Sequence, residues 1–260
     1  MARPVFRRRL ALAALLFAGV AVATIVVTRA ADRLALWRIV HEKCVPDEKT
    51  NGSPAPCESV DISSGEDNGV AILKDIVGVA QFLAIPTRRI TGIEASEILD
   101  PSAPNYWRAA WAARGAMETR LGKPLPREAV GLAINSSRAR SQDQLHIHID
   151  CLSPDIRATL GAHLGEISTD WRALAFDLKG RRYDARRVDS ADLADVAPFR
   201  LLADGDPSAS GAMADETLVA IGATFETGPG FILLADRADP NAGVFAHGED
   251  LLDHSCAIVK

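Results

Sequence analysis

The residues best suited to chemistry are two histidines in a short alternating segment. Polar and apolar residues alternate strictly from Gln144 to Asp150. Because alternate side chains of a β-strand share a face, His146 and His148 would point the same way as these two polar residues. Imidazole can act as a nucleophile, a proton carrier or a metal ligand. Taken alone, the pair is also compatible with a strand that faces water or with a surface metal site.

Neighbouring elements must hold this segment in place. Residues 129–135 form an apolar run and residues 145–151 the alternating strand, with a polar loop between them. A helix is expected next, because Pro154 precedes apolar residues at helical spacing and Ser153 is a suitable N-cap. The histidines are therefore expected on the second strand of a strand, loop, strand, helix unit.

Similar patterns predict the rest of the domain. Two pairs of β-rich runs are expected to form antiparallel hairpins, and one longer apolar pattern is expected to form a helix. The hairpins are residues 70–74 with 81–85 and residues 217–227 with 231–236, and the helix is residues 104–121. Together these elements predict an α+β domain with helices packed against an antiparallel sheet. Residues 34–40 either lie against lipid headgroups or form the first core helix.

The amino-terminal residues have the pattern of a membrane anchor. Four arginines lie within residues 1–9, and residues 10–27 contain no charged residue. As a helix, such a stretch crosses most of the roughly 30 Å hydrocarbon core. The preceding arginines favour a cytoplasmic amino terminus. We therefore expect one retained transmembrane helix, with cleavage before Ala31 as the alternative.

The four cysteines favour an oxidising compartment. Cys44 and Cys57 flank a polar loop that contains proline and glycine, so a local disulfide is expected, which leaves Cys151 to pair with Cys256. The alternative is four buried thiols. Disulfides persist outside the cytoplasm. Together with the anchor, they predict a single-pass protein of the bacterial inner membrane whose catalytic domain lies in the periplasm.

The order of several motifs resembles that of the histidine-triad superfamily. A hydrophobic run ending in Ile85 and Pro86 precedes a basic pair, an Asn-containing strand follows, and His-hydrophobic-His comes last. More specifically, most of the chain after the anchor resembles the bacterial CDP-diacylglycerol pyrophosphatase family, whose members release CMP and phosphatidate from CDP-diacylglycerol. The matching stretches are residues 36–46, 73–75, 82–93, 99–105, 133–136, 146–149 and 185–188, with all four cysteines.

This resemblance implies roles for the residues around the histidines. His146 occupies the position that attacks the nucleotide α-phosphorus, and His148 would stabilise the transferring phosphoryl group or protonate the departing phosphate. The family motif is His-x-His-x-His, so Gln144 departs from it at the first position. Because the middle histidine is intact, this departure is expected to tune the activity and leave the chemistry unchanged. The residues expected to contact substrate are Asn135, Arg138, Arg140, Gln142 and Gln144. Further cations available for phosphoryl charge are Lys74, Arg88 and Arg89. For all the cations the alternative is a solvated surface position.

The sequence thus predicts a membrane-anchored hydrolase in three parts. These are a cytoplasmic tip and anchor at residues 1–31, a histidine-triad-like catalytic domain at residues 32–175, and a carboxy-terminal extension or degenerate second repeat at residues 176–260. The expected substrate is CDP-diacylglycerol in the bilayer, cleaved through a nucleotidyl-histidine intermediate without a metal or cofactor.

Two other functions remain open. One is hydrolysis of soluble nucleotide anhydrides, and the other is a non-catalytic, membrane-tethered module that binds a nucleotide or a metal. The net charge of −5 argues against nucleic acid as a partner. The remaining histidines are scattered along the chain and are expected to be structural, namely His41, His163, His247 and His254.

Overall fold

The computed structural model describes residues 32–259 except Pro207, Ser208 and Ser210. The described residues belong to one compact unit, which is distinct from Met1–Ala31. The predicted anchor at residues 10–27 lies outside the described residues. Within the described part, no helix combines the length and apolar character needed to span a bilayer.

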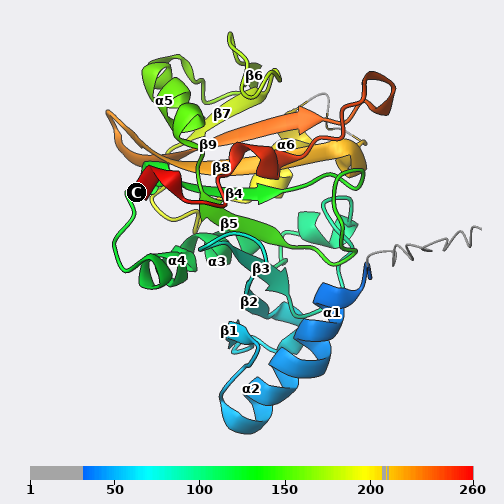
Figure 1. The fold of residues 1–260 in the computed structure, drawn as a ribbon. Helices are drawn as coiled ribbons and strands as arrows, with labels where there is room; N and C mark the ends of the chain where they lie inside the picture. The colour runs from blue at the N-terminus through cyan, green and yellow to red at the C-terminus, as the bar shows by residue number, and fades with distance from the viewer. Residues whose placement is uncertain (1–31, 207–208, 210, 260) are drawn as a thin grey trace, which may run out of the picture. The chain divides into compact units, whose positions relative to one another are not determined.

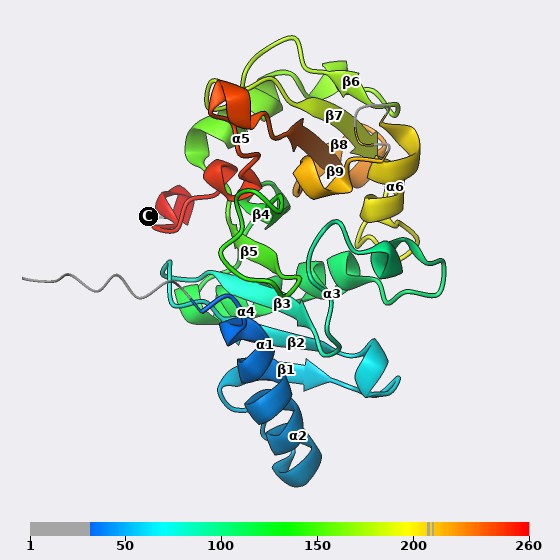
Figure 2. The ribbon, with the colours of Figure 1, turned by 90° about the vertical axis from the view of Figure 1, so that its right-hand side faces the viewer.

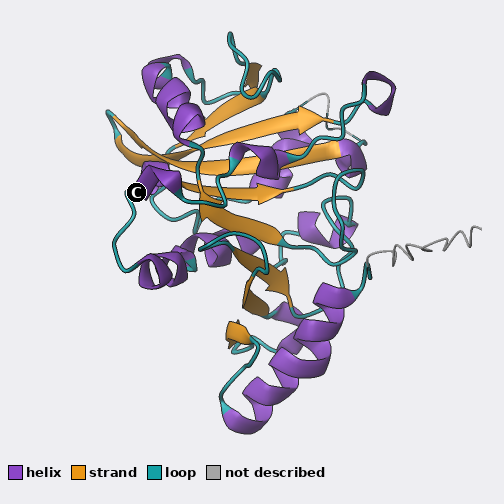
Figure 3. Cartoon of the chain, viewed as in Figure 1, coloured by secondary structure: helices purple, strands orange, loops and turns teal. Residues whose placement is uncertain are grey.

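The described strands form a single antiparallel sheet of nine strands (Figure 1, Figure 3). Their order is β1-β2-β3-β5-β4-β8-β9-β7-β6. The strands are β1 (Cys57–Asp61), β2 (Val70–Lys74), β3 (Phe82–Pro86), β4 (Val130–Ile134), β5 (Ile147–Cys151), β6 (Arg172–Ala173), β7 (Asp184–Val188), β8 (Glu216–Phe225) and β9 (Gly228–Arg237). Position 175 is the predicted end of the catalytic domain. Strands from before and after this position belong to the same sheet.

The described helices are short, and none exceeds the nine residues of Pro154–Ala162. They are α1 (Ala35–Ile39), the π-helical turn η1 (Val40–Cys44), α2 (Val45–Asn51), α3 (Tyr106–Ala112), α4 (Arg114–Leu121), α5 (Pro154–Ala162) and α6 (Pro198–Gly205). Short 3-10 turns are η2 (Glu66–Asn68), η3 (Ser96–Leu99), η4 (Arg127–Ala129), η5 (Leu164–Glu166), η6 (Met213–Asp215), η7 (Pro240–Ala242), η8 (Gly248–Leu251) and η9 (Ala257–Val259). The predicted α+β class with a large antiparallel sheet is confirmed.

Both predicted hairpins are present, with one correction to a turn. β2 pairs with β3 and β8 with β9, each antiparallel. The second turn lies at Glu226 and Thr227 rather than at the following glycine-proline-glycine, because Gly228 already pairs with Phe225. The predicted helix at residues 104–121 is interrupted at Ala113 and forms α3 and α4.

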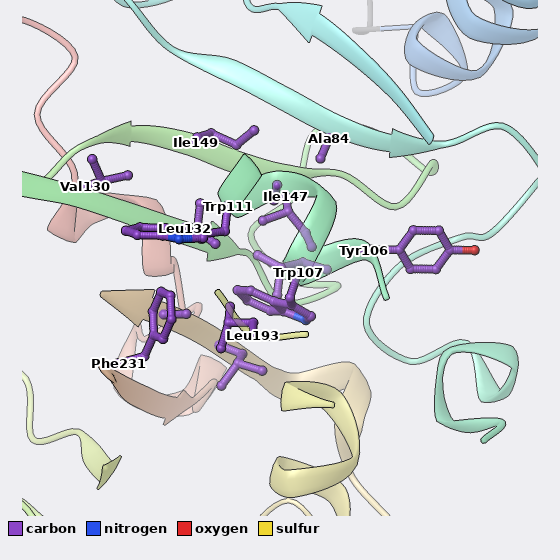
Figure 4. Packing of buried hydrophobic residues seen from close by; sticks show 14 of the residues in the cluster. Ala84, Tyr106, Trp107, Trp111, Val130, Leu132, Ile147, Ile149, Leu193 and Phe231 are labelled. Atoms are coloured by element: carbon purple, nitrogen blue, oxygen red, sulfur yellow. The ribbon is translucent and has the colours of Figure 1, made fainter. Parts of the chain in front are cut away.

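Aromatic packing on one face of the sheet sets the direction of the histidine side chains. Trp107 and Trp111 of α3 are buried in the same apolar cluster as Ile147 and Ile149 of β5, and Figure 4 shows the indole rings beside this part of the sheet. Since neighbouring side chains of a strand point to opposite faces, packing of the two isoleucines directs His148 to the other face.

Two separate apolar clusters cover the ends of this histidine face. One joins α1, η1 and α2 to β1, β2 and β3, and the other joins α5 to β4, β8 and β9. His148 is paired in register with Leu83 of the first cluster and Ala133 of the second. The histidine strand therefore crosses the gap between them. Val40 is fully buried in the first cluster, and Leu36 and Ile39 pack against it. The predicted segment at residues 34–40 therefore begins a helix that packs on the core, with Leu34 at its exposed end.

The carboxy-terminal segment lies over this gap, on the side of the sheet opposite α3 and α6 (Figure 2). Both predicted disulfides are confirmed, Cys44 with Cys57 and Cys151 with Cys256. The second joins the end of β5 to the segment. Ser153 precedes α5 as predicted, but its hydroxyl donates to the carbonyl of Leu252 and caps no helical N–H.

Candidate active site

The backbone holds His146 in one tautomer. His146 directly precedes β5 and is only 6% exposed. Its Nδ1 lies 2.7 Å from the carbonyl oxygen of Gln144. A carbonyl oxygen only accepts hydrogen bonds, so Nδ1 carries the ring hydrogen and Nε2 keeps its lone pair. Burial lowers the pKa of His146, which keeps the ring neutral and Nε2 nucleophilic at neutral pH.

His148 lies next to His146, with the ring centroids 4.9 Å apart. Its Nδ1 is 2.7 Å from the amide nitrogen of Gln81 and 3.2 Å from Oε1 of Glu249. Its Nε2 is buried and has no hydrogen-bond partner among the described residues. The two contacts suit two states of the ring: an unprotonated Nδ1 accepts from Gln81, and a protonated Nδ1 donates to Glu249.

The environment of His148 favours its neutral form. Burial holds the pKa of His148 well below its usual value, and the nearby His146, His247 and His254 lower it further. A neutral imidazole with one partnerless buried nitrogen is suited to exchange a proton or a hydrogen bond with a bound phosphoryl group.

Glu249 is the centre of the polar cluster around His148. Its carboxylate accepts hydrogen bonds from Gln81 Nε2 at 2.8 Å and from Asn135 Nδ2 at 3.2 Å, and its N–H donates to Asn135 Oδ1. His247 and His254 each place Nε2 3.6 Å from this carboxylate. The side chain is therefore fixed by two amides and surrounded by three histidines.

Close packing of a glycine sets the position of Glu249. A Cβ added to Gly248 would lie 2.4 Å from Oγ1 of Thr217 in β8, and the Gly248 N–H donates to the same oxygen. On the neighbouring strand, a Cβ on Gly131 would lie 2.5 Å from Leu252 Cδ2. Glycine at both positions lets the carboxy-terminal segment pack directly on the sheet.

Asp150 lies at the base of the cluster. It is fully buried, and Nδ1 of His254 lies 2.8 Å from its Oδ2. Burial raises the pKa of Asp150 to about 6, although the His254 hydrogen bond opposes the rise. Asp150 also approaches the sulfurs of Cys151 and Cys256, but these are joined in a disulfide and offer no thiolate to a metal.

Comparison with known proteins identifies the family. The profile described as CDP-diacylglycerol pyrophosphatase matches residues 31–260. A CDP-diacylglycerol pyrophosphatase of Yersinia pestis is 38% identical over 259 residues, which cover 100% of this chain and 98% of that protein. The chain belongs to the CDP-diacylglycerol pyrophosphatase family. This membership confirms the resemblance inferred from the motifs and the expectation that the chain is a hydrolase.

In this member of the family, Gln144 has a structural task. It is fully buried, and its amide nitrogen donates to the carbonyl oxygens of Pro86 and Arg88 at 3.0 and 2.9 Å. Gln142 likewise binds backbone groups of the first helical turn, the Leu36 N–H and the Asp32 carbonyl. Both glutamines hold loops beside His146, and their predicted contact with substrate stays a prediction.

The predicted cations also have protein partners. Arg140 is largely buried, pairs with both carboxylate oxygens of Glu94 and contacts Asp143. Its charge contributes to the lowered pKa of His146. Arg138 pairs with Asp215 at 2.8 Å and stays half exposed. Their predicted roles toward substrate are untested by these contacts, whereas Asn135 is brought directly to the cluster through Glu249.

Sequence patterns alone did not reveal Gln81, Glu249 or His254 as parts of this site. His247 and His254, expected to be structural, instead lie next to the Glu249 carboxylate. One signal was present in the sequence. The expected Cys151 to Cys256 disulfide places every residue shortly before Cys256 near the histidine strand.

Proposed function

We propose that this chain hydrolyses the pyrophosphate bond of CDP-diacylglycerol to CMP and phosphatidate through a nucleotidyl-histidine intermediate. Family membership supports the substrate. The observation that carries the mechanism is the contact between His146 Nδ1 and the Gln144 carbonyl. That contact leaves Nε2 with a free lone pair on a buried, neutral ring, which is the form of histidine that attacks phosphorus.

In the first step, His146 Nε2 attacks the cytidylyl phosphorus. A nitrogen–phosphorus bond forms, the bond from that phosphorus to the bridging oxygen breaks, and phosphatidate departs with the bridging oxygen and its electron pair. The modified ring is cationic, and the Nδ1–H donated to Gln144 stabilises this charge. His148 Nε2 donates a hydrogen bond to the phosphoryl group while Nδ1 accepts from Gln81.

In the second step, water attacks the same phosphorus and the nitrogen–phosphorus bond breaks. CMP leaves, and His146 returns to its neutral form. For this step the neutral His148 ring takes its other tautomer, in which Nδ1–H donates to Glu249 and Nε2 holds the lone pair. Nε2 then accepts the proton lost by the water, and the Glu249 carboxylate stabilises the imidazolium through Nδ1–H. Apart from the attacking water and the substrate, every group in this scheme is a side chain or backbone atom of the chain itself.

A product assay tests the proposed reaction. The purified full chain, given CDP-diacylglycerol in mixed micelles, is expected to release CMP and phosphatidate in equal amounts and to keep its rate in a metal chelator. Water-soluble CDP compounds, tested in parallel, address the alternative substrate class. Absence of CMP release from the lipid would contradict the proposal, and a marked preference for the soluble compounds would favour that alternative.

We also propose that the chain is a single-pass protein of the bacterial inner membrane with its catalytic domain in the periplasm. The arginines and uncharged stretch within residues 1–27 support this orientation, and so do the two disulfides. Protease added to spheroplasts is expected to digest the domain while a cytoplasmic marker survives. Protection of the domain under these conditions would overturn the assignment.

A further inference from the structure

Exposed aliphatic and aromatic side chains gather around the active site. The large hydrophobic residues that are exposed in the described part of the chain are Leu34, Ile76, Val77, Val79 and Phe245. We call these residues the apolar rim. Ile76, Val77 and Val79 occupy the turn between β2 and β3, where they are 101%, 48% and 49% exposed. Turns that face water usually carry polar residues, so a turn of exposed aliphatic side chains indicates a surface that contacts an apolar partner.

Several backbone groups of the turn form hydrogen bonds within the protein. The ammonium group of Lys74 donates to the carbonyl oxygens of Asp75 and Gly78 at 2.6 and 2.9 Å. The Val79 carbonyl accepts from Arg120, and its N–H donates to the His254 carbonyl. Satisfied backbone groups lower the cost of placing such a turn in an apolar medium.

This turn is also connected directly to the catalytic cluster. Asp75 accepts from the Val77 N–H through one carboxylate oxygen and from the Gln81 amide through the other. The same Gln81 nitrogen contacts His148 and Glu249. The aliphatic side chains are therefore on one side of a short polar bridge and the reacting histidines on the other.

The other two rim residues lie beside the remaining segments of the site. Leu34 follows Arg33, which pairs with Asp143 of the loop before the histidine strand. Phe245 accepts a hydrogen bond from Ser136 through its carbonyl and shortly precedes Glu249. Figure 2 shows the start of α1, the turn between β2 and β3 and the carboxy-terminal segment on the same side of the sheet.

We propose that the apolar rim docks on the lipid bilayer, with the turn at residues 76–79 entering the boundary between headgroups and acyl chains. This inference rests on the proposed lipid substrate. The acyl chains stay in the bilayer, so the scissile anhydride can reach His146 only if the segments around this histidine face the headgroups. The proposed anchor is also expected to keep this domain close to a bilayer, because only residues 28–31 separate the uncharged stretch from Asp32, whose carbonyl binds Gln142.

A depth-sensitive label tests the docking independently of chemistry. A polarity-sensitive fluorophore is attached at Val77→Cys in the full chain with its disulfides intact, reconstituted in phosphatidylethanolamine–phosphatidylglycerol vesicles. Its emission is expected to shift to the blue and to be quenched by doxyl-labelled lipids. The matched control is Glu226→Cys in the exposed turn between β8 and β9, which is expected to be insensitive to the quencher. Equal quenching at both positions, or none at position 77, overturns the proposal.

An activity comparison tests its consequence for catalysis. The triple variant Ile76→Ser, Val77→Ser and Val79→Ser is expected to lose about 10-fold or more in kcat/KM on CDP-diacylglycerol in vesicles. Its turnover of a water-soluble CDP compound is expected to match that of the parent and of the Glu226→Ser control. Equal loss on both substrates would show a structural role, and no loss on either would point to a protein partner; both results contradict docking. A parent chain inactive on every CDP compound instead contradicts the proposed function, while the label still reports on docking.

Discussion

Replacing His146 with alanine is expected to lower turnover by about 10⁴-fold or more and to remove the covalent adduct completely. The variant lacks the ring whose Nδ1 contacts the Gln144 carbonyl and whose Nε2 is the proposed nucleophile. Rapid acid-free quenching followed by mass spectrometry of the peptide containing residues 145–151 measures the acid-labile nucleotide. The parent chain is expected to carry CMP on this peptide during turnover.

Two variants make this result specific. His163→Ala removes a histidine that pairs with Glu166 outside the cluster, and full activity is expected. His148→Ala keeps the nucleophile, so slow adduct formation is expected to persist. Because burial lowers the pKa of His146, the parent should keep its nucleophile unprotonated below the usual histidine pKa of about 6.5. An enzyme that retains its rate with alanine at position 146 would end this mechanism.

Local patterns were sufficient to predict the elements that build the site. Alternation from Gln144 to Asp150 predicted a strand with the apolar face that β5 packs against α3. The strand begins only at Ile147, so His146 lies just before it and not on it as expected. The hairpins followed from β-rich runs, and both disulfides followed from cysteine number and one polar segment with proline and glycine. That segment was expected to be a loop, but its first part is helix α2. Strands and hairpins depend on residues that are neighbours in the chain, and four cysteines allow few pairings. The sequence alone therefore constrains these features strongly.

Contacts between distant segments were much harder to predict. Glu249 reaches His148 because two glycines let the carboxy-terminal segment pack on β4 and β8. The sequence shows where the glycines are, but it does not show which distant segment packs against each of them. The hydrogen bonds from Gln144 to the carbonyls of Pro86 and Arg88 were not expected, and its predicted contact with substrate stays a prediction. Alternation predicts the face of a polar side chain and leaves its partner undetermined.

Replacing Glu249 with glutamine is expected to lower kcat by about 100-fold and to lower KM with it, so that kcat/KM changes little. The substitution keeps the shape but removes the charge that stabilises protonated His148 3.2 Å away. Only the second step must move a proton to this pair, so hydrolysis of the intermediate is expected to slow far more than its formation. The nucleotidyl-His146 adduct should therefore accumulate, which rapid-quench mass spectrometry measures directly.

Accumulation of adduct separates a role in proton transfer from a role in folding alone. A merely structural loss would slow both steps together and would not raise the occupancy of the adduct. The matched control is Glu226→Gln in the exposed turn between β8 and β9, for which parent-like kinetics are expected. Since Glu249 acts through His148, the double variant Glu249→Gln with His148→Ala should be no slower than His148→Ala alone. Additive losses in the double variant, or a sparse adduct in Glu249→Gln, would show that the carboxylate does not work through this histidine.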